Sequence, residues 1–308
     1  MDKKFQSIFL SNFAQQFLVI YETKNMNKAS KLLNISQPAL SINLRKAEEK
    51  FGFKLFTRSK LGLSSTSLGD IVYDYVKSLM NSSKIFEDEI HSFLDRRKKR
   101  LKIGLGVVWT TTLLPKVMKQ LRSEFPGYNF DIITGVADDI GEKLKNGDVD
   151  VMISAEAKAL GSDHTIKKIF LKQIRYSAIC GSQNTMFNEN EISLEAITKA
   201  EVAAFSNDKF GGEYLEEYFS RFNLKSPTIV TTTNSAAALL AILQSTNHIA
   251  FVLEPLAKRA DELGLKQLKT DQKFSDLSIF IYFQSSLEDL PVISKFTDFV
   301  TKVFSENF

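Results

Sequence analysis

The sequence predicts two kinds of fold in one chain: an N-terminal all-α domain built around a helix-turn-helix, and a larger C-terminal α/β domain. Three observations support this prediction. Two short amphipathic helices, separated by a tight break, occupy residues 27–45. An apolar row with alternating steps of four and three follows in residues 67–93. From residue 101 onwards strand patterns alternate with helix patterns, as in a largely parallel sheet covered by helices.

The chain is long enough for several domains with cores of their own, and its composition is that of a globular protein. Its charge is unevenly distributed. Residues 1–100 contain 18 Lys/Arg and 10 Asp/Glu, a net charge of +8, whereas the rest of the chain has a net charge of −4. A basic N-terminal third predicts a module that binds a polyanion; a chance imbalance of surface charge is the alternative.

The single cysteine, Cys180, excludes an intramolecular disulfide and fits a reducing compartment. The partly apolar stretch at residues 5–21 is interrupted by polar side chains. It is therefore neither the core of a signal peptide nor a membrane span. We expect a cytoplasmic protein without membrane association.

Helix-capping residues define the helix-turn-helix. Asn25 or Asn27 can cap its first helix, and a preceding helix over residues 8–23 is expected to pack beneath the pair. Ser36 is a good N-cap for the second helix, since its hydroxyl can accept a free backbone amide proton. Pro38 lies in the first turn, where its missing N–H is tolerated.

The outer face of this second helix carries polar groups suited to reading bases. Gln37 and Ser41 are four residues apart, so both can point into a major groove, where glutamine can make two hydrogen bonds to adenine. Residues 53–66 predict a two-stranded wing, from which Arg58 would reach phosphates or the minor groove. Thr66 can cap the helix that follows and bring its amides near a phosphate.

The run SQPALS, preceded by KASKLL and followed by EEKFGFKLFTRS and TSLGD, resembles the N-terminal domain of LysR-type transcriptional regulators over about residues 9–70. The resemblance implies that this helix contacts promoter DNA. One departure is Ile42, where relatives often have arginine; Asn43 or Arg45 can substitute for that contact. The residues that we predict to contact DNA are Lys28, Ser36, Gln37, Pro38, Ser41, Asn43, Arg45, Arg58, Lys60 and Thr66.

The apolar row in residues 67–93 predicts one long helix with an apolar stripe along one side. If the helix stood alone, this stripe would have nothing to pack against. The resemblance implies that this helix pairs with its copy in a dimer, and that dimers assemble into a homotetramer. In such a dimer, the two copies of the helix that begins at Ser36 would read an interrupted inverted repeat. The alternative is that the long helix packs on its own chain. The predicted dimerisation residues are Leu68, Val72, Tyr75, Leu79, Phe86 and Phe93.

Two segments, residues 114–135 and 214–234, show the same order: a helix, a proline, a strand and then small or polar residues. This order predicts two similar half-domains. The resemblance implies Rossmann-like halves arranged as in type 2 periplasmic binding proteins. We place the crossings between the halves near residues 160–165 and 265–268. The predicted domains are a winged helix-turn-helix (1–66), a linker and dimerisation helix (67–95), a hinge (96–100) and an effector-binding domain (101–308), with half-domain I at 101–163 and 268–308 and half-domain II at 164–267.

Two such halves create a crevice at the carboxyl ends of their strands, where ligands usually bind. The resemblance implies a small effector, often an anion, and the helix opened by Asn234 and Ser235 favours a carboxylate. Trp109 is either a stacking face or a core residue. The predicted effector-binding residues are Val108, Trp109, Thr110, Thr111, Gly135, Val136, Ala137, Ser154, Phe205, Ser206, Thr233, Asn234 and Ser235.

The sequence contains no HExxH, CxxC, Walker, GxGxxG or GxSxG motif, and its three histidines are far apart. We therefore predict no enzyme, no catalytic residue, no cofactor and no metal. The expected partners are double-stranded promoter DNA, a small effector, further copies of the chain and RNA polymerase. The alternative function is a bilobed, solute-receptor-like protein that binds a small molecule without specific DNA readout, which leaves residues 1–95 unexplained.

Overall fold

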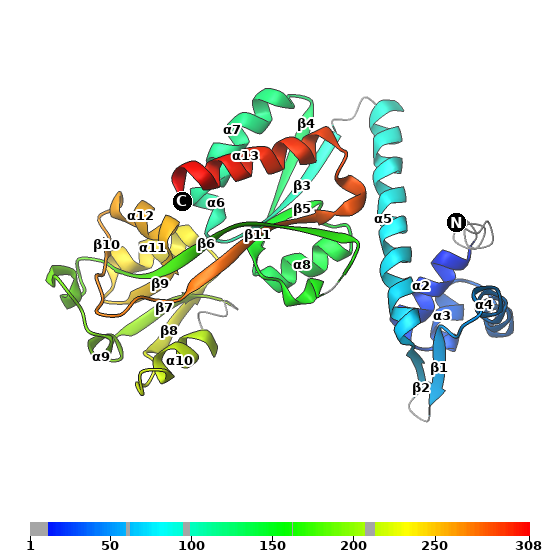
Figure 1. Cartoon of the computed structure of the whole chain (residues 1–308), viewed down its shortest axis with the longest axis horizontal. Helices are drawn as coiled ribbons and strands as arrows, with labels where there is room; N and C mark the ends of the chain where they lie inside the picture. The colour runs from blue at the N-terminus through cyan, green and yellow to red at the C-terminus, as the bar shows by residue number, and fades with distance from the viewer. Residues whose placement is uncertain (1–11, 60–61, 95–98, 162, 207–212) are drawn as a thin grey trace. The chain divides into compact units, whose positions relative to one another are not determined.

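The computed structural model describes residues 12–59, 62–94, 99–161, 163–206 and 213–308, without the side chains of residues 58, 59, 62, 82, 84–94, 213 and 214 (Figure 1). The chain forms two compact units. One contains residues 1–97 together with 163–165, and the other contains residues 98–162 and 166–308. Among the described residues, no helix is both long and apolar enough to cross a membrane.

Capping groups set the ends of the helices in the first unit, as the sequence predicts. The Asn25 side chain accepts the backbone amide protons of Asn27 and Lys28. The Ser36 hydroxyl accepts the amide proton of Ala39 at 3.3 Å. Gly52 ends the helix that Ser36 begins, with φ of 82°. The elements of this unit are α2 (Phe13–Thr23), α3 (Met26–Leu32), α4 (Gln37–Phe51), β1 (Phe56–Ser59), β2 (Gly62–Ser65) and α5 (Ser67–Leu94).

One apolar core joins the helices of this unit, and α2 packs on both α4 and α5. The Tyr21 ring of α2 stacks on the Tyr73 ring of α5 at 3.9 Å, and the Tyr21 hydroxyl donates to Asp70 at 2.8 Å. Burial, followed by the hydrogen bond to Asp70, raises the pKa of Tyr21 to about 12. The wing is anchored by the buried side chains of Leu55 and Phe56.

The exposed stripe of α5 differs from the predicted one by one residue. Val72 is only 8% exposed and belongs to the core of its own unit, so it is wrongly assigned to the stripe. Ile71 is 50% exposed instead, on a stripe with Leu68, Tyr75 and Leu79. The side chains of the other two predicted dimerisation residues, Phe86 and Phe93, lie outside the described residues.

The second unit alternates strands and helices. In Figure 1, α7 and α13 lie side by side on one face of the first half-domain, and α8 lies on the other. The strands are β3 (Lys99–Gly106), β4 (Tyr128–Gly135), β5 (Val151–Ala155), β6 (Ile166–Cys180), β7 (Glu201–Phe205), β8 (Thr228–Thr233), β9 (Ile249–Leu253), β10 (Lys266–Gln267) and β11 (Asp276–Gln284). The helices are α6 (Trp109–Thr112), α7 (Leu114–Glu124), α8 (Ala137–Lys145), α9 (Leu194–Ile197), α10 (Glu213–Ser220), α11 (Ala236–Ser245), α12 (Glu254–Asp261) and α13 (Pro291–Asn307).

The two half-domains have the same strand order, which confirms the predicted internal similarity. The sheet runs β4-β3-β5-β11-β6-β9-β7-β8, with β10 added to β6. In one half β3 pairs in parallel with β4 and β5; in the other, β7 pairs in parallel with β8 and β9. Each half is completed by an antiparallel strand, β11 on β5 and β6 on β9.

The crossings between the halves lie later in the chain than predicted. Residues 166–175 of β6 pair with β11, and residues 176–180 pair with β9, so β6 passes between the halves at Arg175 and Tyr176. On the return, Phe274 packs against Phe251 in the second half, and β11 begins at Asp276. Sequence reasoning also missed α12, which follows β9 directly. Pro255 lies in the first turn of this helix, a position where proline is compatible with a helix.

Candidate nucleic-acid interface and ligand crevice

The N-terminal half of α4 presents the residues that the sequence singles out. Gln37 and Ser41 are half-buried, and Pro38 and Arg45 are exposed. Asn43 is exposed, and its amide donates to Gln16 on α2 at 3.1 Å. The helix therefore offers an amide, a hydroxyl and a guanidinium group along its solvent side, while its core side is fixed against the other helices.

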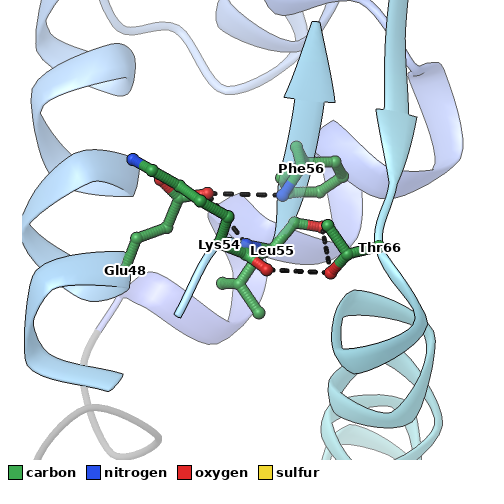
Figure 2. Close-up of polar contacts among 5 residues, drawn as sticks. All are labelled: Glu48, Lys54, Leu55, Phe56 and Thr66. Atoms are coloured by element: carbon green, nitrogen blue, oxygen red, sulfur yellow. Dashed lines mark hydrogen bonds and ion pairs between the residues drawn. The ribbon is translucent and has the colours of Figure 1, made fainter. Parts of the chain in front are cut away.

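Glu48 holds the wing against this helix, and sequence reasoning missed it. Figure 2 shows its carboxylate reaching from α4 to the start of the wing, where Oε1 accepts the amide protons of Leu55 at 2.9 Å and Phe56 at 3.3 Å. The second oxygen forms a 2.7 Å ion pair with Lys54. Glu48 is only 7% exposed, so these bonds satisfy a buried charge.

Thr66 fixes the wing from its other end. Its hydroxyl caps α5 by accepting the Gly69 amide proton at 3.0 Å, which confirms the predicted cap. The same hydroxyl lies 2.8 Å from the Lys54 carbonyl oxygen and 3.3 Å from the Leu55 carbonyl oxygen. Figure 2 draws both contacts as dashed lines. The Thr66 amide also donates to the Leu55 carbonyl, at 3.0 Å. Leu55 is thus held at its amide, its carbonyl and its buried side chain, which sets the position of the wing relative to α4.

The remaining DNA-contact predictions fall around this framework. Lys28 is exposed in the first turn of α3, and Ser36 is exposed at the start of α4. Arg58 lies in β1 opposite Leu63, but its side chain is outside the described residues, as is all of Lys60.

A cavity of about 460 Å³ lies in the second unit. Its lining comes from the carboxyl ends of β3, β4, β5, β7 and β9, together with the crossing segments of β6 and β11. Seven of the thirteen residues predicted to bind an effector are in the lining: Val108, Trp109, Gly135, Val136, Ala137, Ser154 and Phe205.

The other six predicted residues do not line the cavity, and most of their polar groups are used locally. The Thr110 and Thr111 hydroxyls donate to the carbonyls of Val107 and Val108. The Ser235 hydroxyl caps α11, and the Thr233 hydroxyl accepts the Ser235 amide proton, at 3.2 Å. Ser206 and Asn234 complete this group outside the lining.

The lining is more acidic than the sequence suggested. Asp138, Glu156, Glu217 and Asp276 line the cavity, whereas Lys158 is the only cation among the described lining residues. Three of these carboxylates form ion pairs with cations that are not part of the lining. The pairs are Glu156 with Lys168 at 2.6 Å, Glu217 with Arg221 at 2.5 Å and Asp276 with Arg175 at 3.0 Å.

Four aromatic side chains contribute to the apolar part of the lining: Trp109, Tyr176, Phe205 and Phe251. Tyr176 lies where β6 crosses between the halves, and sequence reasoning missed it because the crossing was placed earlier. Trp109 lines the cavity but is only 2% exposed, and its ring packs on Phe304 at 5.0 Å. It therefore acts mainly as a core residue, one of the two predicted alternatives.

Reactive side chains give no sign of a metal centre among the described residues. Cys180 is buried, and burial raises the pKa of its thiol to about 11, so the thiol is protonated at neutral pH. Within the ranges that the structure describes, no three His, Cys, Asp or Glu side chains are grouped so as to hold a metal ion.

Comparison with known families assigns both units. Residues 12–70 match the model described as bacterial regulatory helix-turn-helix protein, lysR family, and residues 95–305 match the LysR substrate binding domain. The chain belongs to the LysR family of transcriptional regulators. As a LysR-type protein it is a DNA-binding regulator with an effector-binding domain, and the alternative of a solute-receptor-like protein is not favoured.

Individual LysR-type relatives are distant in sequence. The regulator CysL of Bacillus subtilis is 24% identical over 232 residues, which cover 74% of this chain and 75% of CysL. The structure of ArgP from Mycobacterium tuberculosis has a TM-score of 0.63 at 19% identity and covers 96% of this chain and 97% of its own. Full-length LysG from Corynebacterium glutamicum with bound effector Arg has a TM-score of 0.62 at 17% identity, with coverages of 95% and 97%. At such identities the solved structures support the fold alone.

Proposed function

We propose that this regulator inserts α4 into the major groove of promoter DNA and reads base edges with Gln37 and Ser41. The supporting observation is the arrangement of α4, whose N-terminal half leaves these two side chains one turn apart and partly exposed, while Glu48 fixes its other end to the wing. Arg45 and Lys28 would contribute to phosphate contacts, and Arg58 and Lys60 would do the same from the wing.

A dimer would bring two such helices to one interrupted inverted repeat. The exposed stripe of α5, with Ile71 and Tyr75 about half exposed, supplies an apolar surface for a second copy. The homotetramer, the cytoplasmic location, the contact with RNA polymerase and the absence of enzymatic activity are part of the same proposal.

The cavity would hold the effector between the half-domains. The family resemblance alone favours an anion there. The lining itself carries four carboxylates against one lysine, which favours a ligand with a cationic group; such a group would compete with Lys168, Arg221 and Arg175, which pair with three of these carboxylates from outside the lining. Tyr176, at the crossing of β6, adds an aromatic ring to the lining that suits a cation or its apolar stem. LysG of Corynebacterium glutamicum, solved with bound effector Arg, is a precedent for such an effector in this fold.

Replacing Ser41 by arginine tests the placement of α4. A duplex site is first enriched from a random library with the wild-type protein. Ser41→Arg is expected to weaken binding to that site by about tenfold or more, because the long side chain displaces a base contact. Its thermal stability should change little, since Ser41 lies partly in solvent.

The matched control is Ser305→Arg, which adds the same group at an exposed position of α13. Both variants are measured by fluorescence anisotropy at one salt concentration, against the enriched site and a scrambled duplex. Equal site affinities of Ser41→Arg and Ser305→Arg would contradict the placement of α4.

Thermal unfolding tests the effector class. We expect agmatine or arginine to raise the melting temperature of the full-length protein, and glutarate to leave it unchanged, because a ligand stabilises the state that binds it. Asp276→Asn should reduce the shift, whereas Glu262→Gln, at an exposed carboxylate outside the lining, should not. Stabilisation by glutarate alone would support the anionic effector and reject the cationic one.

A further inference from the structure

The recognition helix carries an apolar strip on its exposed face. Ile42 is 51% exposed, and Pro38 and Ala39, four and three residues before it, are exposed as well. Residues at these spacings are neighbours on a helix surface. The side of α4 that packs into the core is a different one, formed by Leu40 and Ala47.

Ile42 is not explained by packing within the unit that contains it. It belongs neither to the buried core cluster nor to the partly buried apolar side chains packed around that cluster. A single exposed apolar residue is common on protein surfaces. This one, however, directly follows Ser41 in the half of the helix proposed to face base edges. Its chemistry therefore bears on what the helix can read.

We propose that Ile42 packs against the C5-methyl group of a thymine in each half-site and so selects thymine at that position. This inference rests on the proposed insertion of α4 into the major groove. Base pairs present hydrogen-bond donors and acceptors in that groove, and the thymine methyl is their one apolar group. An isoleucine side chain has no hydrogen-bonding atom, so against any other base edge it would bury polar groups without giving them a partner.

The experiment removes the methyl group from the DNA and leaves the base pair unchanged. Each thymine of the site enriched with the wild-type protein is replaced in turn by deoxyuridine, and the affinity of the full-length protein is measured by fluorescence anisotropy. In each half-site, one of these single replacements is expected to weaken wild-type binding by about fourfold, the effect of one buried methyl group. Ile42→Ala should bind the thymine and uracil versions of that site equally well.

Leu32→Ala is the matched control, because Leu32 is a 62% exposed apolar residue on α3. This variant should keep the fourfold uracil effect. A second selection with Ile42→Arg should enrich guanine where the wild type enriches thymine, since arginine can pair with guanine through two hydrogen bonds.

The possible failures are distinguishable. If no sequence is enriched at all, the proposed DNA readout fails and this inference fails with it. If a site is enriched but no thymine is sensitive to uracil, only the role of Ile42 is rejected. A uracil effect of the same size in Ile42→Ala also rejects that role, because the methyl group would then act through DNA shape or through another residue.

Discussion

Glu48→Ala is expected to lower the free energy of unfolding of the DNA-binding unit by about 3 kcal/mol, because two buried amide groups lose their acceptor. Glu48 accepts from the amides of Leu55 and Phe56 at the start of the wing, and all three side chains are buried. Water cannot easily replace the carboxylate there. The wing should detach from α4, and binding to specific and scrambled DNA should fall together.

Two other variants separate the hydrogen bonds from the charge. Glu48→Gln keeps the oxygen that accepts from both amides, so it should lose less than half as much stability as Glu48→Ala. Lys54→Ala should cost about 0.5 kcal/mol or less, since the Lys54 ammonium is largely exposed and its ion pair is screened by solvent. Glu49→Ala, at the exposed neighbouring position, is the matched control.

The measurement must report on one unit of a two-unit chain. Hydrogen exchange of peptides covering residues 53–66 follows the wing. The fluorescence of Trp109, the single tryptophan of the sequence, follows the other unit, in which it is buried. We expect Glu48→Ala to speed exchange in the wing and to leave the tryptophan transition unchanged. Exchange as slow as in Glu49→Ala would contradict the assigned role of Glu48.

The sequence predicted the helices of the first unit well because their ends depend on local chemistry. The caps at Asn25 and Ser36 and the glycine at position 52 each act within one turn of a helix. Glu48 was missed because its partners lie in the wing and meet it only after folding. A signal was present, however: Glu48 follows the buried Ala47 and precedes the buried Phe51 by one turn, so a carboxylate occupies a position on the apolar side of α4.

The crevice was predicted only in part, for a topological reason. The ends of β3, β4 and β5 lie at one edge of the sheet, and an alternating pattern of strands and helices is enough to find them. The contributions of Tyr176 and Asp276 depend on where β6 and β11 pass between the halves. A strand such as β6, which pairs first with β11 and then with β9, looks uninterrupted in a sequence, so its crossing point leaves no local signal.

A second large effect is expected at Gly69, and its sign distinguishes packing from helix propensity. Alanine is favoured over glycine by about 1 kcal/mol inside a helix, so propensity alone predicts that Gly69→Ala stabilises α5. A Cβ atom at this position, however, would lie 2.2 Å from the Leu55 carbonyl oxygen. That oxygen is backbone and is already bonded to Thr66, so it cannot rotate away. We expect Gly69→Ala to lower stability by about 2–3 kcal/mol.

The control for Gly69→Ala is Ser83→Ala, at an exposed position of the same helix, where only propensity should act. Both variants are compared by hydrogen exchange of the wing, with slower exchange in Gly69→Ala contradicting the packing argument. A double variant adds a stricter test. Glu48 and Gly69 both act through Leu55, so the combined loss in Glu48→Ala, Gly69→Ala should be smaller than the sum of the single losses. Once the wing has separated from α4, Leu55 is no longer held in place, so the added Cβ at position 69 costs less additional stability.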